Sequence, residues 1–223
     1  MIYPPNSQSV KLPQAIVFDW DNTLVDTWFV IRDALNTALT AFGLSPWSME
    51  ETHIRVKKSM RDSFPDLFGE DWESAGEIFY KRYQEIHIEK LVEIEGAQEL
   101  LHSLVSKNIY LSVVSNKRGD ILRSEATQLG WEHYFGAMIG ASDAPEDKPA
   151  REPVDLALSS SEVKAGLEVW FVGDTDIDLE CAKNAGCMAV LICSQPKKDE
   201  ISLYKPDFEF PNCIALSNFI DKL

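Results

Sequence analysis

The chain turns from apolar to acidic within one short stretch, Ala15-Ile16-Val17-Phe18-Asp19-Trp20-Asp21-Asn22-Thr23. Four more apolar runs follow, at residues 109–114, 137–139, 169–172 and 188–192. The apolar residues in these runs are consecutive rather than alternating, which is typical of strands covered on both faces of a parallel sheet. The first stretch therefore predicts a covered strand that ends in carboxylates.

Segments with helical spacing of their apolar residues separate the later runs, at residues 97–105, 120–129 and 175–185. Gly186 follows the last of these segments and is a natural stop for a helix. Strands that alternate with helices form right-handed β-α-β units. We therefore expect an α/β fold, a Rossmann-like three-layer core with a central parallel sheet of about five strands.

The pattern changes between the first and the second apolar run. Residues 27–93 contain no strand-like run and carry three helical candidates instead, at 29–42, 48–63 and 72–89, with Pro65 and Gly69 as breaks. A helical stretch of this length, inserted after one strand, predicts a separate small domain on two linkers. We expect a core at 1–26 and 95–223 and a helical domain at 27–94.

The charge of the chain limits its partners. The 223 residues include 36 acidic and 21 basic side chains, which gives a net charge of −15. Such a surface repels phosphate backbones and anionic headgroups, so we expect no nucleic-acid and no membrane partner. A phosphorylated small molecule would need a local cation. The start of the chain does not resemble a signal peptide and no long apolar run follows, so we expect a cytoplasmic protein.

Polar side chains follow the predicted strands where each strand ends. Asp19 and Asp21 follow the first run, Ser115 the second, and Asp174 and Asp178 the fourth. Ligands of open α/β sheets bind outside the carboxyl ends of the strands, so these groups should converge on one crevice. Four carboxylates there suit Mg²⁺, which takes hard oxygen ligands. The alternative for any one aspartate is that it caps a helix.

Four segments of the chain resemble the four motifs of the haloacid dehalogenase (HAD) superfamily and occur in the same order along the sequence. The first stretch matches the pattern DxDx[TV], and Val113-Val114-Ser115-Asn116-Lys117 is similar to the second motif, hydrophobic residues that end in Ser or Thr. Lys148-Pro149 resembles the third motif and Gly173-Asp174-Thr175-Asp176-Ile177-Asp178 the fourth, GDxxxD. Asn22 stands where relatives often have glycine, and Asn tolerates turn conformations.

The resemblance implies a role for each motif residue. Asp19 would be the nucleophile and Asp21 the general acid and base. Mg²⁺ would bind Asp19, the backbone carbonyl of Asp21 and Asp174, with Asp178 as an outer partner. The residues that would bind the phosphoryl oxygens are Ser115, Asn116 and Lys148. Trp20, between the two aspartates, could pack on the inserted domain or narrow the entrance.

The helical insertion resembles the C1 cap of phosphoglycolate-phosphatase-like members, which closes over the active site and supplies specificity. Its basic side chains could meet a substrate anion: Arg55, Lys57, Lys58 and Arg61. The alternative is that they form ion pairs with neighbours such as Glu50, Glu51 and Asp62. These caps often have a glycine near 56–59, where this chain has none, which weakens a claim to phosphoglycolate itself.

The resemblance as a whole implies a Mg²⁺-dependent phosphatase that hydrolyses a small phosphorylated metabolite through an aspartyl-phosphate. Three alternatives remain open. A phosphomutase or a phosphonate hydrolase could use the same core, and a HAD-like binding protein could keep the fold without catalysis. Asp21 favours phosphoryl transfer over dehalogenation, because a halide leaving group needs no proton. Either a monomer or a homodimer is compatible with the sequence.

Overall fold

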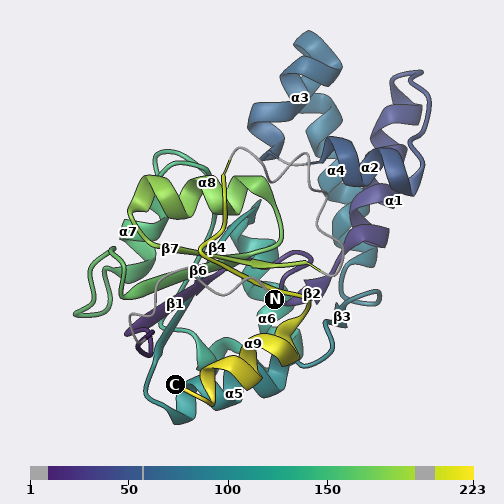
Figure 1. Ribbon diagram of the computed structural model, residues 1–223. Helices are drawn as coiled ribbons and strands as arrows, with labels where there is room; N and C mark the ends of the chain where they lie inside the picture. The colour runs from purple at the N-terminus through teal and green to yellow at the C-terminus, as the bar shows by residue number, and fades with distance from the viewer. Residues whose placement is uncertain (1–9, 57, 194–203) are drawn as a thin grey trace. The chain divides into compact units, whose positions relative to one another are not determined.

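Figure 1 shows a computed structural model, which describes residues 10–56, 58–193 and 204–223. A six-stranded sheet of order β5-β4-β1-β6-β7-β8 lies at its centre. Every neighbouring pair of strands is parallel. The strands are β1 (Ala15–Phe18), β4 (Tyr110–Arg118), β5 (Ala137–Ala141), β6 (Val169–Gly173), β7 (Met188–Ile192) and β8 (Phe208–Phe210). The predicted α/β fold with a central parallel sheet is confirmed.

β5 and β6 run one or two residues past their predicted ends, and two departures from the prediction are larger. β4 continues to Arg118, so Ser115 and the two residues after it belong to the strand rather than to the loop that follows it. The sixth strand, β8, was not expected, because three residues with a half-buried glutamate in the middle do not form an apolar run. Its two phenylalanines are buried beside Trp170 and Phe219.

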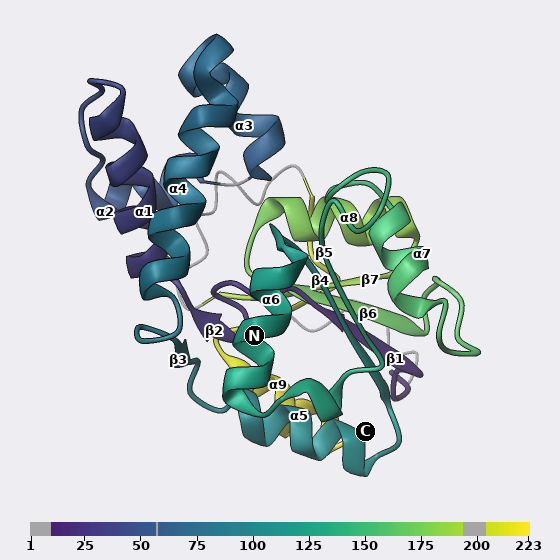
Figure 2. The ribbon, with the colours of Figure 1, turned by 180° about the vertical axis from the view of Figure 1, so that it is seen from behind.

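Helices cover both faces of the sheet (Figures 1 and 2). One face carries α7 (Glu152–Leu158) and α8 (Asp176–Ala185), and the other carries α5 (Ala97–Ser106), α6 (Gly119–Leu129) and α9 (Cys213–Ile220). The first pair buries Val154 and Leu179 against strand residues such as Phe171. α8 ends at Gly186, whose φ of 73° is easily adopted only by glycine, as predicted.

The chain divides into two compact units, one made of the chain up to Val25 and from Glu93 onward, the other of Asp26–Val92. The expected boundaries of the insertion, 27 and 94, lie within two residues of these. The connecting segments contain β2 (Val25–Asp26) and β3 (Val92–Glu93), which pair as a two-stranded sheet. That the second unit acts as a cap stays a prediction.

The second unit contains α1 (Trp28–Ala41), α2 (Met49–Arg55), α3 (Met60–Phe68) and α4 (Trp72–Ile86), with a 3-10 turn at Gly69–Asp71. Its core consists of Leu35, Leu39, Phe64 and Phe68 with smaller neighbours. An ion pair of 2.5 Å between Arg82 and Asp33 joins α4 to α1.

The single helix expected at residues 48–63 is wrong: the structure has two. Ser48 caps α2 through a reciprocal pair of hydrogen bonds with Glu51. Ser59 precedes α3 and donates to Asp62. A second serine followed three residues later by an acid is itself a start signal for a helix. Pro65, expected as a break, lies inside α3, which ends at Gly69 with φ 59°.

Within the described residues, no helix combines the length and the apolar character needed to cross a bilayer.

Candidate active site

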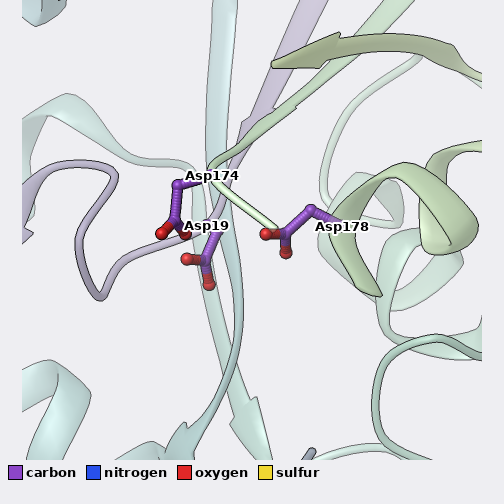
Figure 3. Close-up of side chains that lie close together, drawn as sticks. All are labelled: Asp19, Asp174 and Asp178. Atoms are coloured by element: carbon purple, nitrogen blue, oxygen red, sulfur yellow. The ribbon is translucent and has the colours of Figure 1, made fainter. Parts of the chain in front are cut away.

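Three carboxylates gather where β1 and β6 end (Figure 3). Asp19 follows β1, Asp174 follows β6, and Asp178 lies in the first turn of α8. One oxygen of each lies within 4.8 Å of the others. Asp178 points toward the other two from the helix side. β1 and β6 are adjacent parallel strands, so their carboxyl ends meet at one edge of the sheet.

The side chain of Lys148 reaches into this cluster from the loop between β5 and α7. Its Nζ donates to Oδ1 of Asp19 at 2.5 Å and to Oδ1 of Asp178 at 2.7 Å. All three side chains are at least nine-tenths buried. Lys148, the basic residue of the third motif, is therefore in direct contact with the first aspartate of the first motif.

Burial dominates the electrostatics of the cluster. It raises the pKa of Asp19 to about 7, assisted by the charges of Asp178 and Asp21 and opposed by Lys148. The pKa of Asp174 is raised well above its ordinary value, again by burial first and then by Asp178 and Asp19. Part of the Asp174 side chain is open to solvent, yet protein atoms surround it closely enough to disfavour the charged form.

For Lys148, burial and the neighbouring charges act on the pKa in opposite directions. Burial by itself would lower the pKa of Lys148, but the charges of Asp178 and Asp19 outweigh that effect and raise it above its ordinary value. One ammonium therefore stays charged among three carboxyl groups.

This donor set fits a divalent cation. The oxygens are hard ligands at a spacing that one ion could span. Burial raises the pKa of Asp19 and of Asp174, and a cation bound between them would favour their charged forms. Asp19 and Asp174 are the residues that could hold the ion directly.

Asp178 already has protein partners on both oxygens. Oδ1 accepts from Lys148, and Oδ2 accepts from the backbone N–H of Thr175 at 3.0 Å and from its hydroxyl at 2.7 Å. The carboxylate therefore closes the N-terminus of α8 as well as facing the cluster. This arrangement agrees with the predicted outer position and also with the alternative that it caps a helix.

Asn116 connects the second motif to the third. Its Nδ2 donates to the backbone oxygen of Lys148 at 3.1 Å, and its Oδ1 accepts from the backbone N–H of the same residue at 3.0 Å. These two bonds fix the backbone from which the lysine extends. Ser115 is buried at the end of β4, and its Oγ accepts from the N–H of Lys117 at 3.1 Å. Direct contact of Ser115 and Asn116 with a phosphoryl group stays a prediction.

Asp21 lies in the turn after β1, where Asn22 adopts a φ of 63° as the turn requires. Its Oδ1 is 2.6 Å from Nζ of Lys117. The structure does not place the Asp21 side chain among the three clustered carboxylates, which fits a group that acts on a different atom of the substrate than they do.

The expectation for Trp20 is wrong. Its side chain is fully buried in the core unit, where it packs edge-on against Trp131 and Phe135 and donates from Nε1 to Glu125. An indole between two aspartates on a turn can point inward while both carboxylates point out, because neighbouring side chains face different sides of an extended backbone.

Sequence reasoning assigned no role to three residues that the structure places beside the motifs. The hydroxyl of Thr23 donates to Asp19 at 3.3 Å and to Asp174 at 3.4 Å. Lys117 contacts Asp21 and Glu125. The place of Thr23 in the first motif was a usable signal. Glu125, in the middle of an amphipathic helix, had none.

The basic residues named as candidates in the second unit differ in their surroundings. Arg55 lies over the ring of Trp47, 4.7 Å from its centroid, and 3.7 Å from Glu51. These contacts agree with the alternative of pairing with neighbours. Lys58 is exposed and Arg61 is half-buried, while Lys57 lies outside the described residues. Contact of any of them with substrate stays a prediction.

The family description "Haloacid dehalogenase-like hydrolase" matches residues 16–192, which include β1 from its second residue, β4, β6 and all the clustered carboxylates. The chain belongs to the haloacid dehalogenase-like hydrolase family. The resemblance drawn from the four motifs is confirmed, and so is the expectation that the protein is an enzyme.

Relatives of this HAD-like hydrolase cover nearly all or most of its length. A phosphoglycolate phosphatase from Photorhabdus laumondii is 28% identical, over 97% of this chain and 94% of the relative. Another from Neisseria meningitidis is 31% identical, over 82% of this chain and 81% of the relative. The crystal structure of a HAD-superfamily hydrolase from Ehrlichia chaffeensis is 31% identical, with a TM-score of 0.67 over 96% of this chain and 99% of that one.

Proposed function

We propose that this protein is a Mg²⁺-dependent phosphatase that hydrolyses a small phosphomonoester through an aspartyl-phosphate on Asp19. The observation that carries the proposal is the contact of one buried lysine, Lys148, with the carboxylate of Asp19 beside a set of oxygens that fits a divalent cation. The relatives named phosphoglycolate phosphatase support a phosphomonoester substrate.

In the first step, an oxygen of Asp19 attacks phosphorus while the bond from phosphorus to the leaving oxygen breaks. Asp21 donates a proton to that oxygen, so the alcohol leaves neutral. In the second step, Asp21 takes a proton from water, whose oxygen attacks the same phosphorus and releases phosphate and free Asp19. Splitting one displacement into two replaces a hard step by two easier ones.

Positioning and charge supply the rest of catalysis. Lys148 donates a hydrogen bond to Asp19, which supports its contact with a phosphoryl oxygen bound there, and Ser115 from β4 is the second proposed donor. Asn116 binds the backbone of Lys148 and so holds the lysine in position to contact these oxygens. Mg²⁺, held by Asp19, Asp174 and the backbone carbonyl of Asp21 with Asp178 behind them, would supply positive charge against the transferring group.

The helices of Asp26–Val92 are proposed to act as the cap that selects the substrate, with Arg55, Lys57, Lys58 and Arg61 as the cationic side chains available for an anionic group. Phosphoglycolate, named in the relatives, is the first metabolite to assay, followed by other small phosphomonoesters.

The test is phosphate release from p-nitrophenyl phosphate and a panel of small phosphomonoesters, with Mg²⁺ and with EDTA, for the wild type and for Asp19→Asn. We expect turnover that needs Mg²⁺ and that falls roughly 10³-fold or more in Asp19→Asn. Asp221→Asn, at an exposed site near the C-terminus, is the matched control and should keep full activity. Substantial activity in a clean Asp19→Asn preparation would sink the nucleophile assignment.

A second readout addresses the intermediate directly. Acid quench of the wild type during turnover should trap phosphate on the protein, and hydroxylamine, which cleaves acyl phosphates, should release it. Analysis of the product separates free phosphate from a transferred phosphoryl group, as a phosphomutase would give.

A further inference from the structure

A second buried charge network lies beside the clustered carboxylates. Lys117, near the end of β4, places its Nζ 2.6 Å from Oδ1 of Asp21 and 2.5 Å from Oε2 of Glu125. The lysine side chain is 5% exposed, and that of Glu125, on α6, is fully buried. Two charged side chains have thus been taken out of water next to the loop that carries Asp21.

The same glutamate holds the residue that precedes Asp21. Oε2 of Glu125 accepts a hydrogen bond of 2.8 Å from Nε1 of Trp20. Trp20 is fully buried, with Trp131 and Phe135 packed against its ring. Glu125 therefore fixes the Asp21 loop twice, through the indole of Trp20 and through the ammonium of Lys117 that contacts the Asp21 carboxylate.

Such an arrangement is a poor source of stability. The cost of removing two charges from water can equal or exceed their attraction, and an apolar pair of similar size is often as stable or more so. The network fixes the position of one oxygen of Asp21. Without the contact to Lys117, this side chain on a turn could adopt several rotamers. A misplacement of about 1 Å in a reacting group can lower a rate about 10²-fold.

We propose that Lys117 and Glu125 are positioning residues that hold the carboxyl group of Asp21 where it meets the leaving oxygen. This inference rests on the proposed function, in which Asp21 gives its proton to that oxygen. Neither residue touches the substrate: Lys117 acts through Asp21, and Glu125 acts through Lys117 and Trp20.

The test compares two substrates of nearly the same shape, p-nitrophenyl phosphate and phenyl phosphate. Nitrophenolate leaves readily without a proton, whereas phenolate depends more strongly on a general acid. The ratio of kcat/KM for the first substrate to that for the second therefore reports how well Asp21 protonates the leaving oxygen. A purely structural loss would lower both values together and leave the ratio unchanged.

The main variant is Lys117→Met with Glu125→Gln. Lys117→Met by itself removes the ammonium that offsets the charge of a buried glutamate and could fail to fold, whereas the double change removes both charges and keeps an acceptor for Trp20. We expect a folded protein whose ratio rises about tenfold or more, in the same direction as in Asp21→Asn. Lys107→Met, which removes a lysine from a more exposed pair with Asp221, is the control and should leave the ratio at the wild-type value.

Combining the double change with Asp21→Asn should add a further factor of about three at most, since the network acts only through Asp21. A wild-type ratio in a folded Lys117→Met, Glu125→Gln protein, or losses that simply multiply, would overturn the proposal. If the wild type releases no phosphate, or Asp19→Asn keeps its activity, the proposed function fails instead.

A crystal structure of the folded double variant tests the inference independently of activity. We expect the Asp21 carboxylate to leave its wild-type position by about 1 Å or more, the displacement that affects rates, while Asp19 stays in place. An unmoved Asp21 would contradict the positioning role.

Discussion

Nζ of Lys148 lies 2.5 Å from Oδ1 of Asp19, although 129 residues separate the two in the chain. The contact joins the loop before α7 to the end of β1, and both side chains are almost completely buried. Because the same ammonium also binds Asp178, one positive charge holds together groups from three separate segments. The chemistry proposed for Asp19 and the stability of the core thus depend on the same side chain.

Replacing Lys148 by methionine should therefore lower both activity and stability. The change leaves Asp19 and Asp178 buried without their cation, and breaking a buried pair in this way typically costs about 3–5 kcal/mol in the free energy of unfolding. Urea unfolding at neutral pH measures it. Lys183→Met, which removes a more exposed pair with Asp207, should change that free energy by about 1 kcal/mol or less. Equal losses in the two variants would contradict the assigned importance of burial.

Mg²⁺ should raise the temperature of unfolding. A ligand at about 100 times its Kd stabilises the folded state by roughly 2.7 kcal/mol, which for a chain of this size is a shift of roughly 5–10 °C. Asp174→Asn removes a ligand oxygen and should abolish most of the shift. Asp176→Asn, two residues further on and outside the clustered set, should keep it. Differential scanning calorimetry with Mg²⁺ and with EDTA gives both values, and a full shift in Asp174→Asn would exclude that residue as a ligand.

The affinity for Mg²⁺ should increase with pH. Burial raises the pKa of Asp19 to about 7, so below that pH a cation must displace a proton from the carboxyl group, and above it the group is already charged. The apparent affinity should therefore be about tenfold weaker at pH 6 than at pH 8. Isothermal titration calorimetry in two buffers of different ionisation enthalpy would detect the released protons. Equal affinities at the two pH values would contradict a raised pKa of Asp19 that is coupled to metal binding.

Gly173→Ala should disturb Asp178. A Cβ atom built on Gly173 would overlap the Asp178 side chain, which would have to give up its bonds to Thr175 or to Lys148. Overpacking of this kind costs about 1–3 kcal/mol in the free energy of unfolding. Gly166→Ala, whose new Cβ atom would lie 3.9 Å from the backbone oxygen of Lys164, is the control and should be nearly neutral. Urea unfolding and Mg²⁺-dependent turnover measure the two effects.

Much of the core could be predicted because burial on both faces of a sheet leaves a mark in the sequence. The observed bounds of β1 and β7 are those of the predicted apolar runs. The aspartates after β1 and β6 lie close together at one edge of the sheet, as expected. β8 was missed because its pairing depends on aromatic neighbours from α9 and from β6 rather than on a run of its own.

The limits of sequence reasoning are clearest at Glu125. A glutamate in an amphipathic helix normally faces solvent, and nothing local distinguishes this one. Its buried carboxylate accepts hydrogen bonds from Trp20, 105 positions away in the chain, and from Lys117, on the preceding strand. The bonds of Asn116 were likewise not predicted: its amide binds the backbone of Lys148, while its expected contact with a phosphate stays a prediction. Local sequence patterns predict where strands end, but not which side chains form contacts with one another in the folded protein.

The place of β1 between β4 and β6 also has a consequence during synthesis on the ribosome. Its two neighbours begin at Tyr110 and Val169, so Ala15–Phe18 emerges long before the second of them exists. At about 5–20 residues per second this interval lasts roughly 8–30 s. Every contact within Asp26–Val92, by contrast, is available as soon as that segment has emerged. The nascent chain can thus fold its insertion first, while the apolar strand that precedes Asp19 still lacks its neighbours, and it is this strand that a chaperone would have to shield.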